Sequence, residues 1–388
     1  MHVTRLQLQH FRNYAHADLR LAPGVHVFEG ANGQGKTNLI EAIGYLATLS
    51  SHRVSSDAAL VRAGERSAIV RAELAHGERQ LVIDVEIQRS GSNRARIGGR
   101  QVRARELPRY FTTVLFAPED LALVRGEPAQ RRDFLDSLLV THSPRLGETM
   151  QQYERVLKQR NSLLKSARGG RLDEAAAITL EIFDEQLVAL GAVLVAERLA
   201  LVERLRPHLE RAYAALVGAD HRPGIGMRVS SLADAGRPMD DDAEDDDGAD
   251  LDRDAIAARF AERLAGARAR ELDRGTTLIG PHRDDAVLRL NGLPARLTAS
   301  HGESWSFALS LKLAAAELVR AESRTGDPVL ILDDVFAELD ADRRRRLGDA
   351  IVGFEQVLIT CAVVGDIPEP MRERTIRIRA GEIVEEAA

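Results

Sequence analysis

The segment GANGQGKTN, residues 30–38, constrains this chain more than any other feature. It matches the phosphate-binding pattern G-x-x-x-x-G-K-[ST], which joins a strand to the first turn of a helix. Apolar residues alternate in residues 25–28, as in a short strand, and recur at helical spacing in residues 38–49. A glycine-rich turn can match the pattern by chance, but this context favours a strand, a phosphate-binding loop and a helix.

The residue types of this segment suit a nucleoside triphosphate. Its three glycines let the backbone turn tightly and present consecutive N–H groups to phosphates. Lys36 would reach the β- and γ-phosphates, and the Thr37 hydroxyl would help to hold Mg²⁺. Only four of the 53 basic residues are lysines, so an arginine-rich chain keeps lysine where a compact ammonium is needed. The expected nucleotide-binding residues are Gly30, Ala31, Asn32, Gly33, Gln34, Gly35, Lys36, Thr37 and Asn38.

A second motif, VLILDD at residues 329–334, supplies the carboxylates that such a site needs. Its apolar run is long enough for a buried parallel strand. At the end of that strand Asp333 would hold Mg²⁺, and Asp334 would orient or deprotonate the attacking water. Two acids after an apolar run can also simply begin a helix, and the presence of Lys36 favours the catalytic interpretation.

Composition limits the class of protein. No run approaches 18 consecutive apolar residues and residues 1–24 are polar, so we expect a cytoplasmic protein without a membrane span. The single cysteine, Cys361, excludes an internal disulfide. Residues 240–252 hold nine acids and no base, and without them the net charge changes from −6 to +3. We interpret this acidic run as a solvated loop rather than a docking tail.

Arginines gather at two places, residues 343–346 and the stretch that holds Arg94, Arg96, Arg100, Arg103 and Arg105. Such clusters can neutralise a nucleic-acid backbone, although an arginine-rich composition also produces clusters by chance. Aromatic residues make up only 4% of the chain, which leaves few platforms for stacking unpaired bases. Phosphate contacts to duplex DNA therefore fit the composition better than single-strand binding by stacking.

Periodicity divides the chain into two kinds of structure. The first third alternates like strands in residues 3–27, 68–74, 81–87 and 94–102, the last with a Gly-Gly hairpin turn. From residue 130 apolar steps of three and four predict helices. Two of them, around residues 146–164 and 183–201, would form either a short antiparallel arm or a compact helical subdomain. Helices are also predicted at residues 254–272 and 305–318, and an Asn-Gly hairpin at residues 287–297.

These patterns predict an α/β protein whose nucleotide-binding head is interrupted by a helical insertion. Residues 1–118 would form the N-terminal part of the head with the phosphate loop. Residues 119–272 would form a helical, short coiled-coil-like arm domain that includes the acidic loop. Residues 273–388 would complete the head.

Several longer segments point to one family. The turn SHGES, residues 300–304, precedes VLILDD at the distance at which ATP-binding cassette proteins carry the serine-glycine turn that caps the γ-phosphate held by the other protomer. FRNY at residues 11–14, PEDLALVRGEPAQRRDFLD at 118–136, GPHRDD at 280–285 and LDDVFAELD at 332–340 complete the pattern. With these motifs in order, the chain resembles the RecF recombination-mediator family, relatives of SMC ATPase heads, nearly end to end.

The resemblance implies an ABC-type ATPase head that binds ATP and Mg²⁺, dimerises on ATP and hydrolyses it slowly, stimulated by DNA. It also implies binding to double-stranded DNA near gaps or junctions, and work with RecR, and often RecO, to load recombinase onto single strands.

The resemblance carries Ser300 and Gly302 over as γ-phosphate contacts, whereas His301 and Glu303 depart from the more usual Ser-Gln-Gly-Gln turn. Glu119 would take the place of a metal- and water-contacting Gln. Weaker candidates are His282, Arg283 and Thr360. Two other functions stay open, namely a transporter's energising subunit and a scaffold that binds ATP without turnover, and Asp334 favours turnover.

Overall fold

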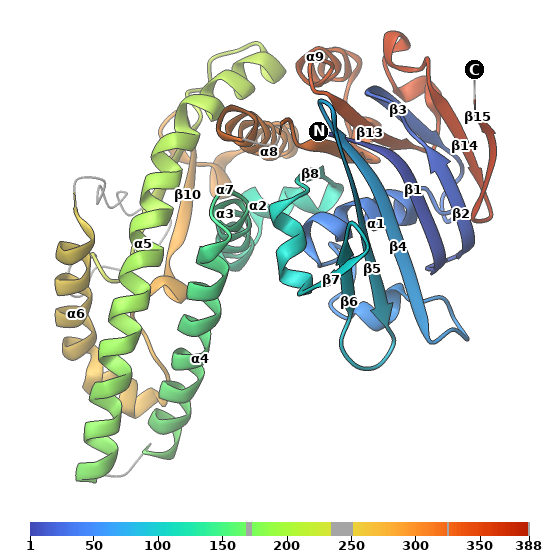
Figure 1. Ribbon diagram of the computed structural model, residues 1–388. Helices are drawn as coiled ribbons and strands as arrows, with labels where there is room; N and C mark the ends of the chain where they lie inside the picture. The colour runs from blue at the N-terminus through green and yellow to red at the C-terminus, as the bar shows by residue number, and fades with distance from the viewer. Residues whose placement is uncertain (168–172, 234–250, 324–325, 387–388) are drawn as a thin grey trace. The chain divides into compact units, whose positions relative to one another are not determined.

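The computed structural model describes residues 1–167, 173–233, 251–323 and 326–386, which form two compact units (Figure 1). The head unit comprises Met1–Asp120, Arg211–Ala219 and Ala308–Ala388, and the helical unit comprises Leu121–Glu210 and Asp220–Phe307. The division expected from the sequence differs mainly at residues 273–307, which pack here with the helical unit. Residues 240–250 of the expected acidic loop lie outside the described residues.

A mostly parallel sheet organises the head unit. Its strand order is β15 (Glu382–Glu386), β14 (Thr375–Arg379), β3 (Gly24–Glu29), β13 (Gln356–Cys361), β12 (Val329–Asp333) and β8 (Thr113–Phe116). Only β14 and β15 pair antiparallel. Every residue of β12 and β13 is buried, as expected for central strands that read as continuous apolar runs. The parallel strands bring the loop after β3 and the end of β12 to the same edge.

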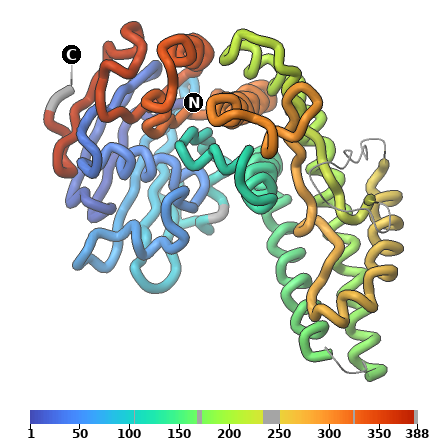
Figure 2. The backbone as a smooth tube through the Cα atoms, turned by 180° about the vertical axis from the view of Figure 1, so that it is seen from behind, coloured from blue at the N-terminus to red at the C-terminus, as the bar shows by residue number. Residues whose placement is uncertain are grey.

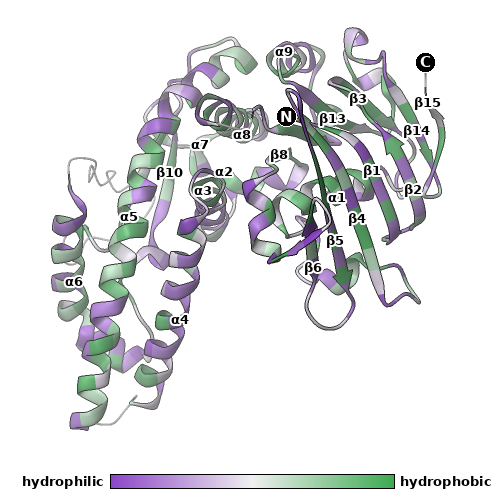
Figure 3. Cartoon of the chain, in the orientation of Figure 1, coloured by the Kyte–Doolittle hydropathy of each residue, from purple (hydrophilic) through white to green (hydrophobic). Residues whose placement is uncertain are grey.

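A second, antiparallel sheet packs on helix α1 (Lys36–Thr48). Its order is β2 (Tyr14–Arg20), β1 (His2–Phe11), β4 (Ser67–His76), β5 (Arg79–Gln88), β6 (Arg94–Ile97) and β7 (Arg100–Val102). One face is apolar and shares a core with Leu39 and Ile43 of α1. Because successive side chains in a strand alternate between faces, the other face is polar, and hydrophilic and hydrophobic residues alternate along the strands in Figure 3.

Shorter elements complete the head unit. They are η1 (Asp57–Leu60), η2 (Ala104–Arg109), η3 (Pro118–Asp120), η6 (Val335–Glu338), α9 (Ala341–Ile351), η7 (Val364–Asp366) and η8 (Glu369–Met371). Asp340 caps α9, because its side chain accepts a hydrogen bond from the Arg343 N–H. Helix α8 (His301–Glu322) covers the predicted helix at 305–318 and belongs to the head unit from Ala308 onward.

The main helices of the helical unit are α2 (Leu121–Arg125), α3 (Pro128–His142), α4 (Arg145–Ser166), α6 (Arg253–Arg274) and, as far as Glu210, α5 (Glu174–Val217). The predicted pair of long helices is confirmed as α4 and α5, which lie side by side in both views (Figures 1 and 2). Their shared core with α6 includes Tyr153, Leu187 and Phe260. Among the described residues, no helix is long and apolar enough to cross a bilayer.

Two arginines that interrupt the apolar faces of these helices are buried in polar networks. Arg160 has no exposed surface, and its guanidinium donates to Asp184 Oδ1 at 2.7 Å, Glu271 Oε2 at 2.7 Å and Thr277 Oγ1 at 2.8 Å. Arg198 donates to both carboxylate oxygens of Asp136 at 2.7 Å. Full pairing makes burial of these charges tolerable, because an unpaired buried charge would cost several kcal/mol.

The helical unit also holds a short sheet of β9 (Gly224–Arg228), β10 (Asp285–Leu290) and β11 (Leu293–Pro294), and η5 (Pro281–Arg283) leads into β10. The predicted Asn-Gly turn is confirmed, with φ of 52° at Asn291 and 80° at Gly292. The predicted second strand is wrong beyond Pro294, because Ala295–Thr298 form helix α7. From β11, only Leu293 and Pro294 pair with β10, and Pro294 has no N–H with which to continue the ladder.

Candidate active site

The loop of residues 30–35 turns from β3 into α1 in a conformation that needs glycine. Gly33 and Gly35 have φ of 80° and 117°, in the left-handed region that L side chains rarely adopt. A Cβ on Gly30 would lie 2.4 Å from the Ile378 carbonyl oxygen. Ala31, Asn32 and Gly33 are exposed, and the first N–H groups of α1 have no intrahelical acceptor. The loop therefore offers an anion a row of backbone donors at a helix N-terminus.

The two sequence motifs meet at Asp333. The Thr37 hydroxyl donates to Asp333 Oδ1 at 2.9 Å, and the Thr360 hydroxyl donates to the same oxygen at 2.6 Å. Burial alone would raise the pKa of Asp333, but the nearby His52 ring and hydrogen bonds from Thr360 and Thr37 outweigh it and lower the pKa. Lys36, only 3% exposed, lies beside this pair and donates to the Ala31 carbonyl at 3.4 Å.

Asp334 occupies a strained position next to Asp333. Its φ of 51° and ψ of 21° are left-handed, which is uncommon for a residue other than glycine. Its N–H donates to Thr360 Oγ1 at 2.9 Å, whereas its Oδ1 is buried without a hydrogen-bond partner among the described residues. Burial raises the pKa of Asp334, with the Lys36 charge acting against that rise and Asp333 adding to it. The two neighbouring acids therefore have opposite protonation tendencies.

His52 is a site residue that the sequence did not reveal. It lies in the loop after α1, and its Nε2 is 3.8 Å from Asp333 Oδ2, the oxygen that Thr37 and Thr360 leave open. Its only sequence signal is a position shortly after the predicted helix, which is too weak to single out one histidine among eleven.

The FRNY segment braces the loop. Asn13 Nδ2 donates to the Gln34 carbonyl at 3.1 Å, and Asn13 Oδ1 accepts from Asn38 Nδ2 at 2.8 Å. The Tyr14 hydroxyl donates to the Gly35 carbonyl at 3.1 Å. From the turn between β1 and β2 and the first residue of β2, these two side chains hold the end of the glycine loop that leads into α1, so FRNY positions the loop.

Glu119 stands apart from these contacts. It is exposed in η3, after β8, the strand beside β12, so it lies at the same edge of the sheet as Asp333. Among the described residues it has no hydrogen bond or ion pair with Lys36, Asp333 or Asp334. Its neighbour Asp120 is held instead, accepting from the Ala117 N–H at 2.9 Å and lying 3.4 Å from Lys312 Nζ.

In the helical unit, Ser300 and Glu303 form a reciprocal cap at the start of α8. The Ser300 N–H donates to Glu303 Oε2 at 2.7 Å, and the Glu303 N–H donates to Ser300 Oγ at 3.3 Å. Ser300 and His301 are exposed and Gly302 is partly exposed. Glu303, the departure from the more usual turn, thus fixes the backbone of Ser300 and Gly302 in place.

Comparison with known proteins agrees with this geometry. The family model of the RecF/RecN/SMC N-terminal domain matches residues 2–380. DNA replication and repair protein RecF of Clavibacter sepedonicus is 57% identical over 99% of this chain and 95% of its own length. The corresponding protein of Leifsonia xyli subsp. xyli is 54% identical over 99% and 100%. The chain belongs to the RecF family.

Solved structures extend the likeness to the RecF fold. The recombination mediator RecF-ATP of the RecFOR pathway has a TM-score of 0.84 and 27% identity, with 100% of this chain and 97% of that chain covered. An SMC head domain from Pyrococcus furiosus, at 15% identity and a TM-score of 0.54, shares the fold. The predicted fold class, an α/β ATPase head of the RecF and SMC kind with helical segments, is confirmed.

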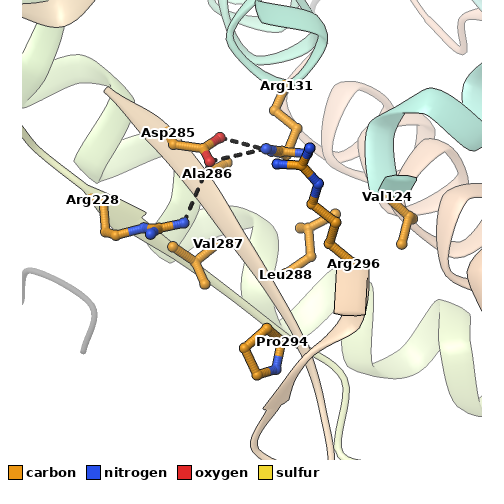
Figure 4. A pocket seen from close by; sticks show the side chains of 9 residues that line it. All are labelled: Val124, Arg131, Arg228, Asp285, Ala286, Val287, Leu288, Pro294 and Arg296. Carbon is orange, nitrogen blue, oxygen red and sulfur yellow. Dashed lines mark hydrogen bonds and ion pairs between the residues drawn. The ribbon is translucent and has the colours of Figure 1, made fainter. Parts of the chain in front are cut away.

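Two RecF-like segments meet inside the helical unit. Arg131, from residues 118–136, donates to both oxygens of Asp285, from GPHRDD, at 2.7 and 2.9 Å (Figure 4). Arg228 of β9 also reaches Asp285 Oδ2 at 3.5 Å. His282 and Arg283 both contact the Thr277 carbonyl. Arg131 and Asp285 therefore join the two RecF-like segments, whereas His282 and Arg283 contact a backbone carbonyl outside both segments.

Proposed function

We propose that this protein is an ATP-dependent recombination mediator of DNA replication and repair. One observation carries the proposal: Thr37 of the glycine loop and Asp333 of β12, 296 residues apart, are hydrogen-bonded beside the buried Lys36. This is the arrangement that a bound nucleoside triphosphate requires. The RecF relatives support ATP as that nucleotide.

The donor set also fits Mg²⁺. A hydroxyl and an ionised carboxylate at 2.9 Å from each other are hard oxygen ligands, which Mg²⁺ prefers together with phosphate oxygens. Thr37 and Asp333 would hold the ion, directly or through its waters. The ion would neutralise charge on the transferred phosphoryl group.

Hydrolysis to ADP and phosphate is proposed to use Asp334 as the group that orients or accepts a proton from water. Its unpaired, buried oxygen and raised pKa support this role. Glu119, exposed at the same sheet edge, would contact the metal ion and the water only when nucleotide is bound. We propose that turnover is slow and stimulated by DNA, in the cytoplasm, with double-stranded or gapped DNA, RecR and RecO as partners.

ATP would also join two copies of the chain. Each nucleotide would be held by Lys36, Thr37 and Asp333 of one protomer and capped by Ser300 and Gly302 of the other. The exposed turn at the N-terminus of α8 supports this, because its first N–H groups suit a γ-phosphate. ATP then favours the dimer, since it adds contacts that the monomer lacks.

A mixture of two inactive variants tests this mechanism. Lys36→Ala removes the phosphate's ammonium partner, and Ser300→Arg places a long side chain where the opposing γ-phosphate must approach. Neither should dimerise on ATP in light scattering, and each alone should lose ATPase activity. In a mixed dimer one composite site carries both lesions and the other carries neither, so partial activity should return.

The result distinguishes the arrangements clearly. Recovery of activity in the mixture requires that the loop and the turn act in trans. Normal hydrolysis by Ser300→Arg alone would contradict the sandwich, and normal dimerisation of Lys36→Ala would contradict the phosphate role of the loop.

A further inference from the structure

The hairpin of β6 and β7 is the most basic part of the head unit that the ATP site does not use. Residues 94–109 contain six arginines and one acid, Glu106. The three arginines on which we focus are Arg94, Arg96 and Arg103, hereafter the arginine hairpin. β7 is the edge strand of the antiparallel sheet, so one side of the hairpin has no neighbouring strand.

Strand geometry gathers these charges. Arg94 and Arg96 are two residues apart, and between them Ala95 is buried in the core, so both arginines point away from it. The antiparallel register places Ala95 opposite Val102, so Arg103 lies one residue further along, toward Arg94. Arg100 pairs with Ile97 and is two residues from Val102, so it lies on the other, apolar face of the hairpin and does not belong to this group. The side chains of Arg94 and Arg96 are 63% and 48% exposed.

Little of this charge is neutralised within the fold. Arg94 lies 3.7 Å from Glu86, and Arg96 lies 3.4 Å from Asp84. An ion pair of an exposed arginine such as Arg94 is worth less than about 1 kcal/mol and can be exchanged for another anion. Arg96 pairs instead with a carboxylate that is only 8% exposed. The side chain of Arg103 is exposed and makes no hydrogen bond or ion pair with the described residues. The arginine run of α9 is more fully paired, because Arg343, Arg344 and Arg345 each form an ion pair with an aspartate.

We propose that the arginine hairpin is a contact surface for the phosphate backbone of duplex DNA. The inference rests on the proposed DNA-binding function and names the surface that serves it. Guanidinium groups spaced about 7 Å apart on one strand face match a line of phosphates better than an isolated anion. Residues 94–103 include no aromatic side chain, so the hairpin has no platform for stacking unpaired bases.

The test is the salt dependence of duplex binding. In the double variant Arg94→Gln and Arg103→Gln, two charges are removed while Arg96 stays to pair with Asp84, which is only 8% exposed. The slope of log K against log salt should become shallower by about 1.8, because each lost phosphate contact removes about 0.9. Affinity for a duplex at 0.1 M salt should fall on the order of 100-fold.

A matched control removes the same net charge elsewhere. The double variant Arg259→Gln and Arg345→Gln changes two exposed arginines on α6 and α9, and its slope should stay at the wild-type value. ATP binding and ATP-dependent dimerisation should be normal in both double variants, which also shows that they fold. The single substitution Arg103→Glu, at an exposed position, should lower duplex affinity at low salt if the double hairpin variant is unstable.

Failure of the surface and failure of the proposed function give different results. If wild-type protein binds duplex and the hairpin variant keeps the same slope and affinity, the arginine hairpin is not the contact surface. Equal effects of the two double variants would attribute the loss to net charge and would also overturn the inference. If wild-type protein does not bind duplex at any salt, the proposed function itself is wrong.

Discussion

At the scale of single residues, the site separates two adjacent aspartates by their surroundings. Asp333 receives hydroxyl hydrogen bonds from Thr37 and Thr360, which lower its pKa and keep it ionised. Asp334 has a buried oxygen without a partner among the described residues, and burial raises its pKa. Groups of one chemical type whose environments push their pKa values apart usually have different roles. The structure therefore favours Asp333 for the cation and Asp334 for the water.

Asp334→Asn should separate binding from hydrolysis. The variant keeps Thr37, Asp333 and Lys36, so ATP affinity should change less than about threefold, while turnover should fall about 100-fold or more because the proton acceptor is lost. Fluorescent-nucleotide titration and phosphate release measure the two quantities, and the ATP dimer should persist on DNA. A parallel loss of affinity and turnover would move Asp334 from water activation to metal binding.

At the scale of elements, the sequence predicted what local pattern determines. The loop, the buried strand of VLILDD, the α4–α5 pair and the Asn-Gly turn follow from glycine positions and apolar periods. The partners of Arg160 could not be predicted, because Asp184, Glu271 and Thr277 are 24, 111 and 117 residues away. His52 was missed for the same reason, since only the folded chain brings it to Asp333.

The turn after α6 gives the helical unit a pH dependence that can be isolated at His282. Burial, followed by nearby arginines, lowers the pKa of His282 to about 4, against a hydrogen bond to the Thr277 carbonyl that raises it. In the unfolded chain the pKa of this histidine returns to about 6.5. Between the two pKa values the unfolded state binds more protons than the folded state, so the free energy of unfolding decreases as the pH falls. The stability lost between the two pH values should reach about 3 kcal/mol.

Comparison with His282→Gln isolates this effect. Asp284, whose burial raises its pKa to about 6, acts in the opposite direction but is common to both proteins and cancels in the difference. The stability advantage of wild type over the variant should therefore shrink from pH 6.5 to 4 in denaturant titrations. His301→Gln, at an exposed position, should leave the pH dependence unchanged. A difference between wild type and His282→Gln that is constant with pH would show that folding does not shift the pKa of His282.

At the scale of the whole molecule, the phosphate loop and the serine-glycine turn belong to different units of one chain. The loop is braced within the head unit by Asn13 and Tyr14, whereas Ser300 is braced within the helical unit by Glu303. Each can therefore be complete in a monomer, and what links them in the proposed mechanism is a nucleotide shared between two chains. Amide hydrogen exchange can follow both at once, because their peptides are far apart in sequence.

ATP should slow exchange in residues 30–38 of every chain that binds it, but in residues 300–304 only when a dimer forms. The N–H groups of His301 and Gly302 lack intrahelical acceptors, so they exchange readily until a γ-phosphate covers them. Ser300→Arg should retain protection of the loop and lose protection of the turn, whereas Lys36→Ala should lose both. In a mixture of the two variants, the turn of Lys36→Ala chains should regain protection by capping nucleotide on Ser300→Arg partners. Protection of the turn in wild-type protein diluted below its dimerisation range would instead mean that the turn responds to nucleotide bound by its own chain.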